Sequence, residues 1–541
     1  MSETAAGDSR EAALVKQSAT SPTGVRPSGN VLFITLDQWR GDSLSALGHR
    51  LVRTPTLDRL ASRGVLFANH WANAAPCGPS RASLYTGMYL QNHRSALNGT
   101  PLDSRFTNIA LEARSIGYDP VLFGYTDTSV DPRTVPPGDP RLRSYEGVLP
   151  GFRPIVNDPE NGTVGREWVR WLAERGREIP SDPKRLFDPD LSYPGASDHP
   201  SSWAPALFSR EETETAFLTD KLLAYLEEHG DSPFFVHASY IRPHPPYRNP
   251  AGYHDLYCLE DVPPFVAHET REAEAAMHPL NEVLLGLPYL AAPDIQAERR
   301  QLRATYHGMQ REVDDQLGRL FDWLDSSGLS TNTLVVLTSD HGEMGGDHWI
   351  FGKAGYFDES YSIPLIVADP RPTADATRGL VVREVTESVD VLPTILAWIG
   401  VEIPTQVDGW PLTAFIEQGS APEHWRREAH FEWDFRHPVT KLAESYLGIP
   451  SAHCLLNVIR SERYKYVQFA AEADLLPPLL FDLEADPGQL TDVSRSPEHR
   501  DGLVESAQRL LQWRMRNDER TLVNHFLDPR RGLVVSSDSW R

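Results

Sequence analysis

The sequence predicts an α/β protein: a large, mostly parallel sheet with helices on both faces, followed by a smaller C-terminal α+β subdomain. Two observations lead to this fold class. Short and continuously apolar runs of residues recur along the chain, and such runs are typical of strands buried on both faces. Amphipathic helical patterns precede two of these runs, and an alternation of helix and strand is typical of a parallel sheet.

Three strands form the expected centre of the sheet. They are predicted at residues 31–34, 233–240 and 333–337. Before the third strand, apolar residues recur at steps of three and four over 302–324, which predicts one buried face of a helix. The C-terminal part adds strand-like stretches at 464–469 and 479–483 and a helix at 503–516.

Polar side chains directly follow these three strands. Asp37 comes after the first strand, His244 after the second, and Asp340 with His341 after the third. In open α/β sheets, ligands bind beyond the carboxyl ends of the strands. We therefore expect these four side chains to converge on one site.

Changes in composition divide the chain into three expected parts. Residues 1–29 are polar and are interpreted as a flexible tail, 30–409 as the α/β domain, and 410–541 as the C-terminal subdomain and tail. Within the α/β domain, residues 131–200 contain 12 of the chain's 44 prolines. This predicts an irregular insertion that forms the wall or lid of a pocket.

Charge and composition exclude several classes of partner. The 52 basic and 75 acidic residues give a net charge of −23, which repels nucleic acids and anionic membrane surfaces. No apolar run approaches the length of about 20 residues that a membrane span needs. Three scattered cysteines and a polar N-terminal stretch argue against a disulfide framework and a secretory signal. We therefore expect a cytoplasmic protein.

The most specific motif is Cys77-Gly78-Pro79-Ser80-Arg81. Taken alone, a single cysteine is more often a small buried hydrophobic residue. Here Pro79 and the small residues after it favour the start of a helix, where backbone amides attract an anion. With this motif the chain resembles the type I sulfatases and the phosphonate monoester hydrolases of the alkaline phosphatase superfamily. Their Cys-x-Pro-x-Arg motif marks a cysteine that a formylglycine-generating enzyme oxidises to formylglycine.

The resemblance extends from Asn30 to the C-terminal helix and implies an alkaline phosphatase-like fold. It rests on further motifs, which are Asn30-Val-Leu-Phe-Ile-Thr-Leu-Asp37-Gln38, Thr54-Pro-Thr-Leu-Asp-Arg-Leu-Ala, Ser339-Asp-His-Gly-Glu343 and Phe481-Asp-Leu-Glu-Ala-Asp-Pro487. The implied cofactors are formylglycine made from Cys77 and one divalent metal. One hydroxyl of the hydrated aldehyde would bind the metal and become the nucleophile, with its charge held by Arg81.

The expected metal ligands are Asp37, Gln38, Asp340 and His341, together with residue 77. Taken alone, each aspartate is more typical of a turn or a helix cap. Sulfatases usually have aspartate in place of Gln38 and asparagine in place of His341, and the phosphonate hydrolases share the substitutions found here. The two substitutions together move the site from calcium chemistry towards manganese, zinc or iron. We expect manganese, with zinc, iron and calcium as alternatives.

The resemblance also assigns the groups that act on the substrate. His244 matches a histidine that faces the leaving group, and Lys353 matches a lysine between the nucleophile and the substrate oxygens; either is otherwise an ordinary loop cation. Asn98 and Tyr125 match substrate contacts of the phosphonate hydrolases. Asp127 replaces their threonine. It either faces the transferred group and repels a dianion, or pairs with Arg133 and orders the loop.

These features predict a promiscuous hydrolase of small anionic esters, namely aryl sulfates, phosphonate monoesters and phosphodiesters. The reaction would pass through a covalent adduct on a geminal diol at residue 77. One alternative is a strict sulfatase for a single physiological ester, and another is a catalytically silent homologue that binds an anion. Apolar residues in the tail 521–541, and the dimers or tetramers of relatives, predict a homo-oligomer.

Overall fold

The computed structural model describes residues 27, 29–157, 165–519 and 521–535. Most of the segment predicted as a flexible tail lies outside these residues. In the described part of the chain, no helix combines the length and the apolar character that crossing a membrane requires.

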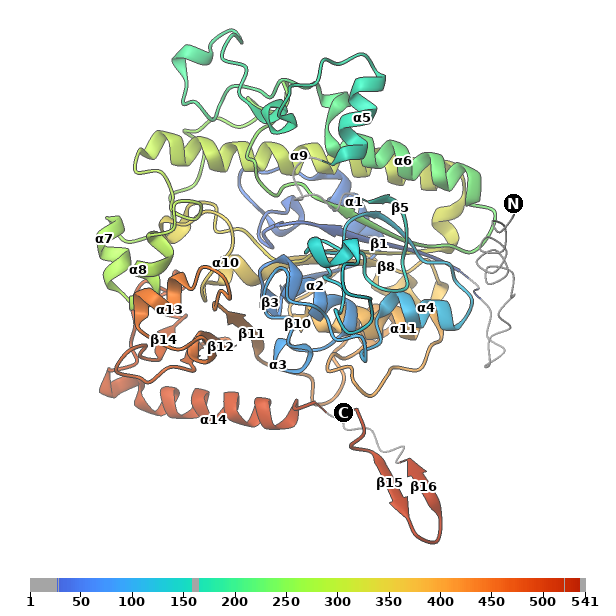
Figure 1. Cartoon of the computed structure of the whole chain (residues 1–541), viewed down its shortest axis with the longest axis vertical. Coiled ribbons are helices and arrows are strands. Elements are labelled where there is room, and N and C mark those ends of the chain that lie inside the picture. Colours follow the sequence, from blue (N-terminus) through green and yellow to red (C-terminus); the bar gives the residue numbers. More distant parts are fainter. Residues whose placement is uncertain (1–26, 28, 158–164, 520, 536–541) are drawn as a thin grey trace, which may run out of the picture.

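A nine-stranded sheet forms the centre of the molecule, with strand order β10-β2-β8-β7-β1-β6-β4-β5 and β9 beside β2 (Figure 1). Its strands are β1 (Asn30–Leu36), β2 (Val65–Trp71), β4 (Val121–Gly124), β5 (Arg153–Asn157), β6 (Phe235–Tyr240), β7 (Thr333–Ser339), β8 (Ser362–Ala368), β9 (Leu380–Val382) and β10 (Thr386–Glu387). Only β8 runs antiparallel to its neighbours. The prediction of a large, mostly parallel sheet is confirmed, and the three predicted strands correspond to β1, β6 and β7.

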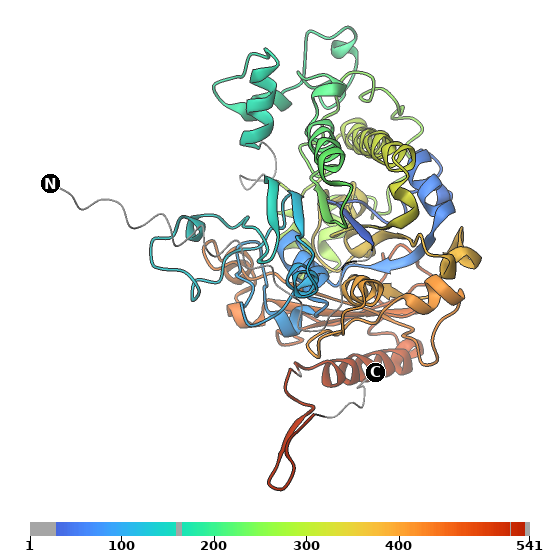
Figure 2. The ribbon, with the colours of Figure 1, turned by 90° about the vertical axis from the view of Figure 1, so that its right-hand side faces the viewer.

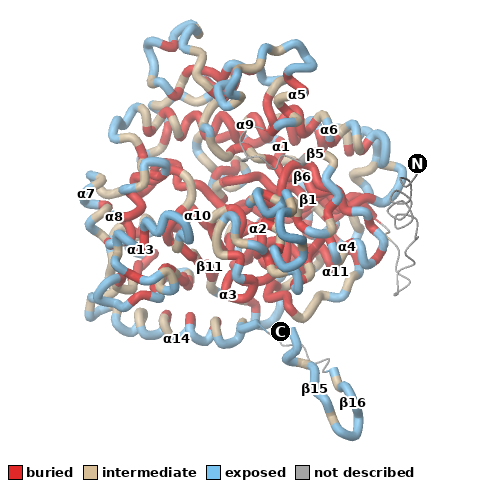
Figure 3. Tube along the Cα trace, viewed as in Figure 1, coloured by how far each residue is buried: buried red, intermediate tan, exposed pale blue. Residues whose placement is uncertain are grey.

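Strand β1 explains why the apolar runs are continuous. All seven of its residues are buried. Val31 and Phe33 point into the core on one face of the sheet, whereas Leu32 and Ile34 point into the core on the other face. A strand covered on both faces has no solvent side, so it lacks the alternation of polar and apolar residues. Figure 3 shows this buried centre in red.

Two sets of helices cover the sheet (Figure 1). One face carries α1 (Pro55–Arg63), α5 (Arg166–Glu174), α6 (Glu214–His229) and α9 (Gln296–Ser326). The other face carries α2 (Cys77–Thr86), α4 (Ile109–Ser115), α11 (Val391–Ile399) and α12 (Thr413–Gln418). The helix predicted at 302–324 lies within α9. The helices on both faces bury the apolar side chains of the sheet, as the fold class requires.

A second, five-stranded sheet forms the C-terminal part, in the order β14-β13-β12-β11-β3. Its strands are β3 (Ala74–Ala75), β11 (Ala429–Asp434), β12 (Leu455–Arg460), β13 (Tyr464–Phe469) and β14 (Leu479–Asp482). The predicted helix corresponds to α14 (Arg500–Arg516), whose Leu510 and Trp513 pack on this sheet. Because β3 leads directly into α2, the second sheet is joined to the helix that begins with Cys77.

The remaining α-helices and strands are short. They are α3 (Leu90–His93), α7 (Arg271–Ala276), α8 (Pro279–Leu285), α10 (Asp358–Tyr361), α13 (Leu442–Leu447), β15 (His525–Asp528) and β16 (Gly532–Val535). Strands β15 and β16 form a hairpin that projects from the body of the protein, as Figure 2 shows.

Candidate functional site

Four side chains converge beyond the carboxyl ends of β1 and β7. Ligand atoms of Asp37, Cys77, Asp340 and His341 lie within 4.8 Å of one another, and all four residues are buried. His341 Nε2 lies 3.2 Å from Cys77 Sγ, 3.6 Å from Asp340 Oδ2 and 3.8 Å from Asp37 Oδ1. The convergence expected from the strand ends is present for Asp37, Asp340 and His341, and Cys77 joins them from the start of α2. His244, the fourth residue of that expectation, lies along the pocket beside the cluster.

The register of the central strands brings the two aspartates together. Leu36 at the end of β1 lies opposite Ser339 at the end of β7, so the residues that follow are neighbours. Gln38 has a positive φ of 68°, which is uncommon for a residue other than glycine. Its backbone N–H donates to Asp340 Oδ1 (3.1 Å), and its carbonyl accepts from the Tyr306 hydroxyl (2.8 Å). These bonds hold the strained turn.

Cys77 is the first residue of α2, as the sequence predicted. Burial raises the pKa of its thiol well above the usual range, and the carboxylates of Asp37 and Asp340 add to the rise, while Lys353 opposes it. A thiol that stays protonated is a poor nucleophile. Unmodified Cys77 is therefore unsuited to attack an ester.

Arg81, one turn into α2, binds both carboxylates. Its Nε lies 2.9 Å from Asp340 Oδ2 and its Nη2 lies 3.3 Å from Asp37 Oδ2. Ser239 at the end of β6 accepts from Nη1 at 2.8 Å. Because Arg81 is fully buried, these partners compensate a charge that would otherwise be costly. Arg81 thus fixes the positions of the two aspartates.

The cluster has the character of a metal site. His341 Nδ1 faces the carbonyl of Gly342 (3.1 Å), which only accepts, so Nδ1 carries the proton and Nε2 presents a lone pair to the cluster. Asp37 Oδ1 is buried without a hydrogen-bond partner. Carboxylate oxygens and an imidazole lone pair that face one another need a cation between them. This donor set therefore fits a divalent metal.

Lys353 lies beside the cluster and Gln38. Its Nζ donates to Gln38 Oε1 at 2.7 Å. Burial alone would lower the pKa of Lys353, but Cys77, Asp37 and Asp340 outweigh burial and raise it. The ammonium group therefore keeps its charge.

His244 lies at the same pocket as Lys353. Its Nδ1 faces the carbonyl of Pro245 at 2.7 Å, so Nδ1 is the protonated nitrogen. Burial, together with the charge of Lys353, lowers the pKa of His244 to about 3. The imidazole is therefore neutral at pH 7, with its lone pair on Nε2.

The hydroxyl of Tyr125 and the amide oxygen of Asn98 already have partners within the protein. The hydroxyl donates to Asp37 Oδ2 and accepts from Arg81 Nη2 (3.0 Å). Asn98 Oδ1 accepts from the backbone N–H of Gly78 at 2.8 Å, at the start of α2. In this structure the Tyr125 hydroxyl binds the carboxylate of Asp37, and the Asn98 side chain binds a backbone N–H in the first turn of α2.

Asp127 lies against the same helix start. A side chain added to Gly78 would meet the carbonyl oxygen of Asp127 at 3.4 Å. Asp127 is buried with a positive φ of 54°, and its Oδ1 has no hydrogen-bond partner. Burial raises its pKa to about 7, with Glu146 adding to the rise and Arg81 opposing it.

The alternative in which Asp127 pairs with Arg133 is wrong. Arg133 instead binds Asp131 and Asp103, at 2.6 Å in each case. The reason is local: Asp131 also accepts the backbone N–H of Arg133 (2.9 Å), so the turn itself supplies the partner of the arginine.

A pocket of 500 Å³ opens beside the cluster. Gln38, His244 and Lys353 lie along it, and most of its wall is apolar. The apolar wall comes from α8 and the loop after it, and from residues 433–443, and includes Leu280, Leu284, Leu287, Leu290, Trp433, Phe435 and Leu442. None of its lining residues belongs to 131–200. Among the described residues, the expected wall is thus built by other segments.

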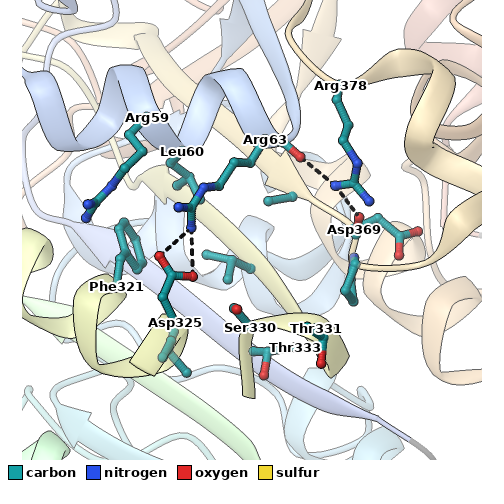
Figure 4. Close-up of a pocket in the computed structure, with 14 residues that line it drawn as sticks. Arg59, Leu60, Arg63, Phe321, Asp325, Ser330, Thr331, Thr333, Asp369 and Arg378 are labelled. Atoms are coloured by element: carbon teal, nitrogen blue, oxygen red, sulfur yellow. Dashed lines mark hydrogen bonds and ion pairs between the residues drawn. The ribbon is translucent and has the colours of Figure 1, made fainter. Parts of the chain in front are cut away.

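A second hollow, of 390 Å³, lies at the opposite edge of the sheet, where β7 begins (Figure 4). Arg63 binds Asp325 at 2.7 Å, and Arg378 donates to the carbonyl oxygens of Arg63 (2.8 Å) and Asp369 (3.3 Å). These cations are held by groups of the protein itself. We therefore place the candidate functional site at the other hollow, at the carboxyl ends of the strands.

Sequence reasoning gave no role to Ser239, Tyr247 or Glu343, which the structure connects to the site. Ser239 binds Arg81, and Tyr247 and Glu343 bind each other and Gln38. The position of Ser239 at the end of a central strand was a signal for its role. Glu343 stands in the Ser339–Glu343 motif, but its partner Tyr247 comes from a distant loop that the sequence does not place.

Comparisons with known proteins agree with this geometry. A model of the sulfatase family matches residues 29–401, and a model of the C-terminal part of N-sulphoglucosamine sulphohydrolase matches residues 346–516. The chain is 40% identical over 525 residues to the multifunctional alkaline phosphatase superfamily protein PehA of Trinickia caryophylli, covering 94% of this chain and 99% of that protein. It is 28% identical to an arylsulfatase of Clostridium perfringens, over 87% of this chain and 91% of that enzyme.

A solved structure is also closely similar. The phosphonate monoester hydrolase of Agrobacterium radiobacter superposes with a TM-score of 0.88 at 42% identity, covering 94% of this chain and 100% of that chain. This similarity spans both sheets.

Proposed function

The chain belongs to the sulfatase family of the alkaline phosphatase superfamily, and we propose that it is a formylglycine- and metal-dependent hydrolase of aryl sulfates, phosphonate monoesters and phosphodiesters. Membership makes it a hydrolase of sulfate or phosphonate esters. The single observation that carries the finer proposal is the convergence of Asp37, Cys77, Asp340 and His341 beside an apolar pocket.

The charges of the site support an anionic substrate. The two carboxylates of Asp37 and Asp340 are balanced by Arg81 and Lys353, so the protein groups alone are close to neutral. A bound divalent metal would supply two positive charges and a Lewis acid for a substrate oxygen. The site would then attract a small anion in spite of the net charge of −23 for the whole chain.

The protein groups have separate roles in this proposal. Residue 77, once oxidised to formylglycine, would supply in hydrated form one hydroxyl that attacks sulfur or phosphorus and a second that releases the product. Asp37, Gln38, Asp340 and His341 would hold the metal. Lys353 carries donor hydrogens for the substrate oxygens, whereas His244 must take up a proton on Nε2 before it can donate to the departing alcohol.

The pocket supports an apolar leaving group. Its wall of leucine and aromatic side chains lies next to His244 and Lys353, where the alcohol part of an ester would be released. An aryl group buried there loses contact with water, which is favourable by about 25 cal/mol per Å². The pocket therefore favours aryl esters over small alkyl esters.

Parallel kinetics test the function. Values of kcat/KM for one aryl alcohol esterified as sulfate, phosphonate monoester and phosphodiester are expected to be measurable for all three esters. Turnover of the sulfate alone would support the strict sulfatase. Turnover of none, by protein shown to carry formylglycine and metal, would support the silent homologue.

The state of the three cysteines is evidence about the cellular compartment in which the protein works. None of them forms a disulfide, and Cys258 is exposed. Unpaired cysteines support the proposal that the protein works in the reducing cytoplasm.

Asp127 is expected to make the enzyme discriminate against phosphate monoesters. Its pKa of about 7 means that the carboxyl group is neutral below pH 7 and charged above it. As the pH rises through 7, turnover of an aryl phosphate should fall relative to the aryl sulfate, because a dianion is repelled by the carboxylate. Asp127→Asn should reduce that difference about tenfold at pH 8.

The substrate itself titrates near this range, so each pH profile is compared with that of Asp127→Asn, which cancels that contribution. A ratio of aryl phosphate to aryl sulfate turnover that is the same in both proteins at every pH would contradict a role of Asp127 in charge selection.

The projecting hairpin supports a homo-oligomer. Phe526, Leu527 and Leu533 are 64%, 78% and 59% exposed, which is unusual for three large apolar residues on one small hairpin. Light scattering at micromolar concentration should report a dimer or a tetramer. Phe526→Asp with Leu527→Asp should shift it towards the monomer, whereas Leu511→Asp, at an equally exposed site on α14, should not. A monomeric wild type would end this proposal.

A further inference from the structure

Glu343 is a buried carboxylate beside the proposed metal ligands, and all of its acceptor positions are occupied. Oε1 accepts from the backbone N–H groups of Gly345 (2.6 Å) and Gly352 (2.7 Å). Oε2 accepts from the hydroxyl of Tyr247 (2.7 Å) and from Nε2 of Gln38. Both glycines have positive φ values, 57° and 82°, which suit the tight turns around the carboxylate.

These contacts decide which way the Gln38 amide points. The shape of a glutamine amide does not distinguish its oxygen from its nitrogen, so its neighbours must. Glu343 only accepts at this position, so it takes the NH₂ group of Gln38. Lys353 only donates, at 2.7 Å on the other side, so it takes the amide oxygen. Both neighbours require the same orientation.

We propose that Glu343 is a positioning residue that fixes the amide of Gln38 so that its oxygen, not its nitrogen, faces the metal and Lys353. The inference rests on the proposed role of Gln38 as a metal ligand. An amide oxygen offers lone pairs to a cation, whereas an NH₂ group offers hydrogens that the cation repels. A reversed amide would therefore remove one ligand and one partner of Lys353.

The same carboxylate connects three loops of the site. It reaches the turn after β1 through Gln38, the loop of His244 through Tyr247, and the loop of Lys353 through Gly352. One residue thus sets the relative positions of a proposed metal ligand and of the groups that face the leaving alcohol. Partners of metal ligands commonly change metal affinity by 10- to 100-fold when they are replaced.

Glu343→Gln is the direct test. The N–H groups of Gly345 and Gly352 will keep the oxygen of the new amide, so its NH₂ group will face Gln38. Two NH₂ groups cannot bond each other, and Gln38 is expected to reverse. The affinity for Mn²⁺ alone, measured by calorimetry or electron paramagnetic resonance on metal-depleted protein, should fall about tenfold or more.

An exchange of the two residues should restore the site. In Gln38→Glu with Glu343→Gln, the carboxylate at 38 accepts from the amide at 343 and still presents an oxygen to the metal, and the total charge is unchanged. This double variant should bind Mn²⁺ more tightly than Glu343→Gln alone. Tyr247→Phe is the matched control, because it removes the bonds of the Tyr247 hydroxyl to Glu343 (2.7 Å) and to Gln38 Nε2 (3.3 Å) but keeps the bond between Gln38 and Glu343, and its affinity should change by less than about threefold.

Two results would overturn the proposal. The first is a folded Glu343→Gln protein, judged by its thermal transition, that binds Mn²⁺ as tightly as the wild type. The second is a double variant that fails to fold or binds Mn²⁺ no better than Glu343→Gln alone. Ester turnover by the wild type is measured separately, so an inactive protein with the expected Mn²⁺ pattern would refute the proposed function and leave the role of Glu343 intact.

Discussion

Replacement of Cys77 with alanine is expected to lower kcat/KM for every ester by about 10³-fold or more, because the variant has no side chain that can become formylglycine. The fold should survive. The cysteine side chain is small, and its loss from a buried position costs about 1 kcal/mol by the scale of buried aliphatic groups. The measurements are steady-state kinetics and the thermal transition of both proteins.

The mass of the tryptic peptide that contains residue 77 provides the control for this prediction. In active wild-type protein, the tryptic peptide with residue 77 should weigh about 18 Da less than the cysteine form, the difference between a thiol and an aldehyde. Cys77→Ser should also lose most of its activity, since a single hydroxyl cannot release the product as a diol can. Fully active protein with an unmodified cysteine would contradict the proposed chemistry.

The fold was largely predictable because the pattern of apolar residues indicates which strands are buried. The run Val31–Ile34 is apolar at every position, and such a run is typical of a strand covered on both faces. The meeting of Asp37 with Asp340 was predictable for a related reason. Adjacent parallel strands end at the same edge of a sheet. The residues that directly follow two such strands are therefore neighbours, and the structure of the connecting loops does not change this.

Other parts of the site depend on packing between segments that are far apart in the sequence. The pocket wall joins Leu284 on α8 to Trp433 on β11, and no local pattern in either segment marks that contact. Asp127 owes its raised pKa to burial and to Glu146, which lies later in the long connection between β4 and β5. A rule about the spacing of residues does not predict which groups become neighbours after folding.

Tyr125 shows another property that the sequence does not predict, which is the direction of a side chain. The motif marks the residue as functional, and the resemblance implies a substrate contact. In the structure its hydroxyl is shared between Asp37 and Arg81, which makes it a partner of the cluster. A sequence motif identifies the residue at a position, but the direction of its side chain depends on neighbours that other strands supply.

The second large effect is expected from removal of the metal. Chelation should abolish ester turnover, because Asp37, Asp340 and His341 have no other means of polarising a substrate oxygen. The depleted protein should stay folded, since Arg81 and Lys353 already balance the two carboxylates. Because the metal binds the folded chain and not the unfolded one, its removal should lower the midpoint of a still cooperative thermal transition, together with the loss of activity.

Restoration by individual metals then tests the ligand set. His341 presents Nε2 to the cluster, and an imidazole ligand is suited to manganese, zinc or iron, whereas calcium prefers oxygen ligands throughout. We expect Mn²⁺, Zn²⁺ or Fe²⁺ to restore turnover better than Ca²⁺. His341→Asn replaces the imidazole with an amide oxygen, so it should reduce the advantage of Mn²⁺ over Ca²⁺ by about tenfold. His348→Asn is a matched control, because that buried histidine binds Glu274 at 2.8 Å and is not part of the cluster. Restoration of the wild type by calcium alone would show that the imidazole is not a ligand.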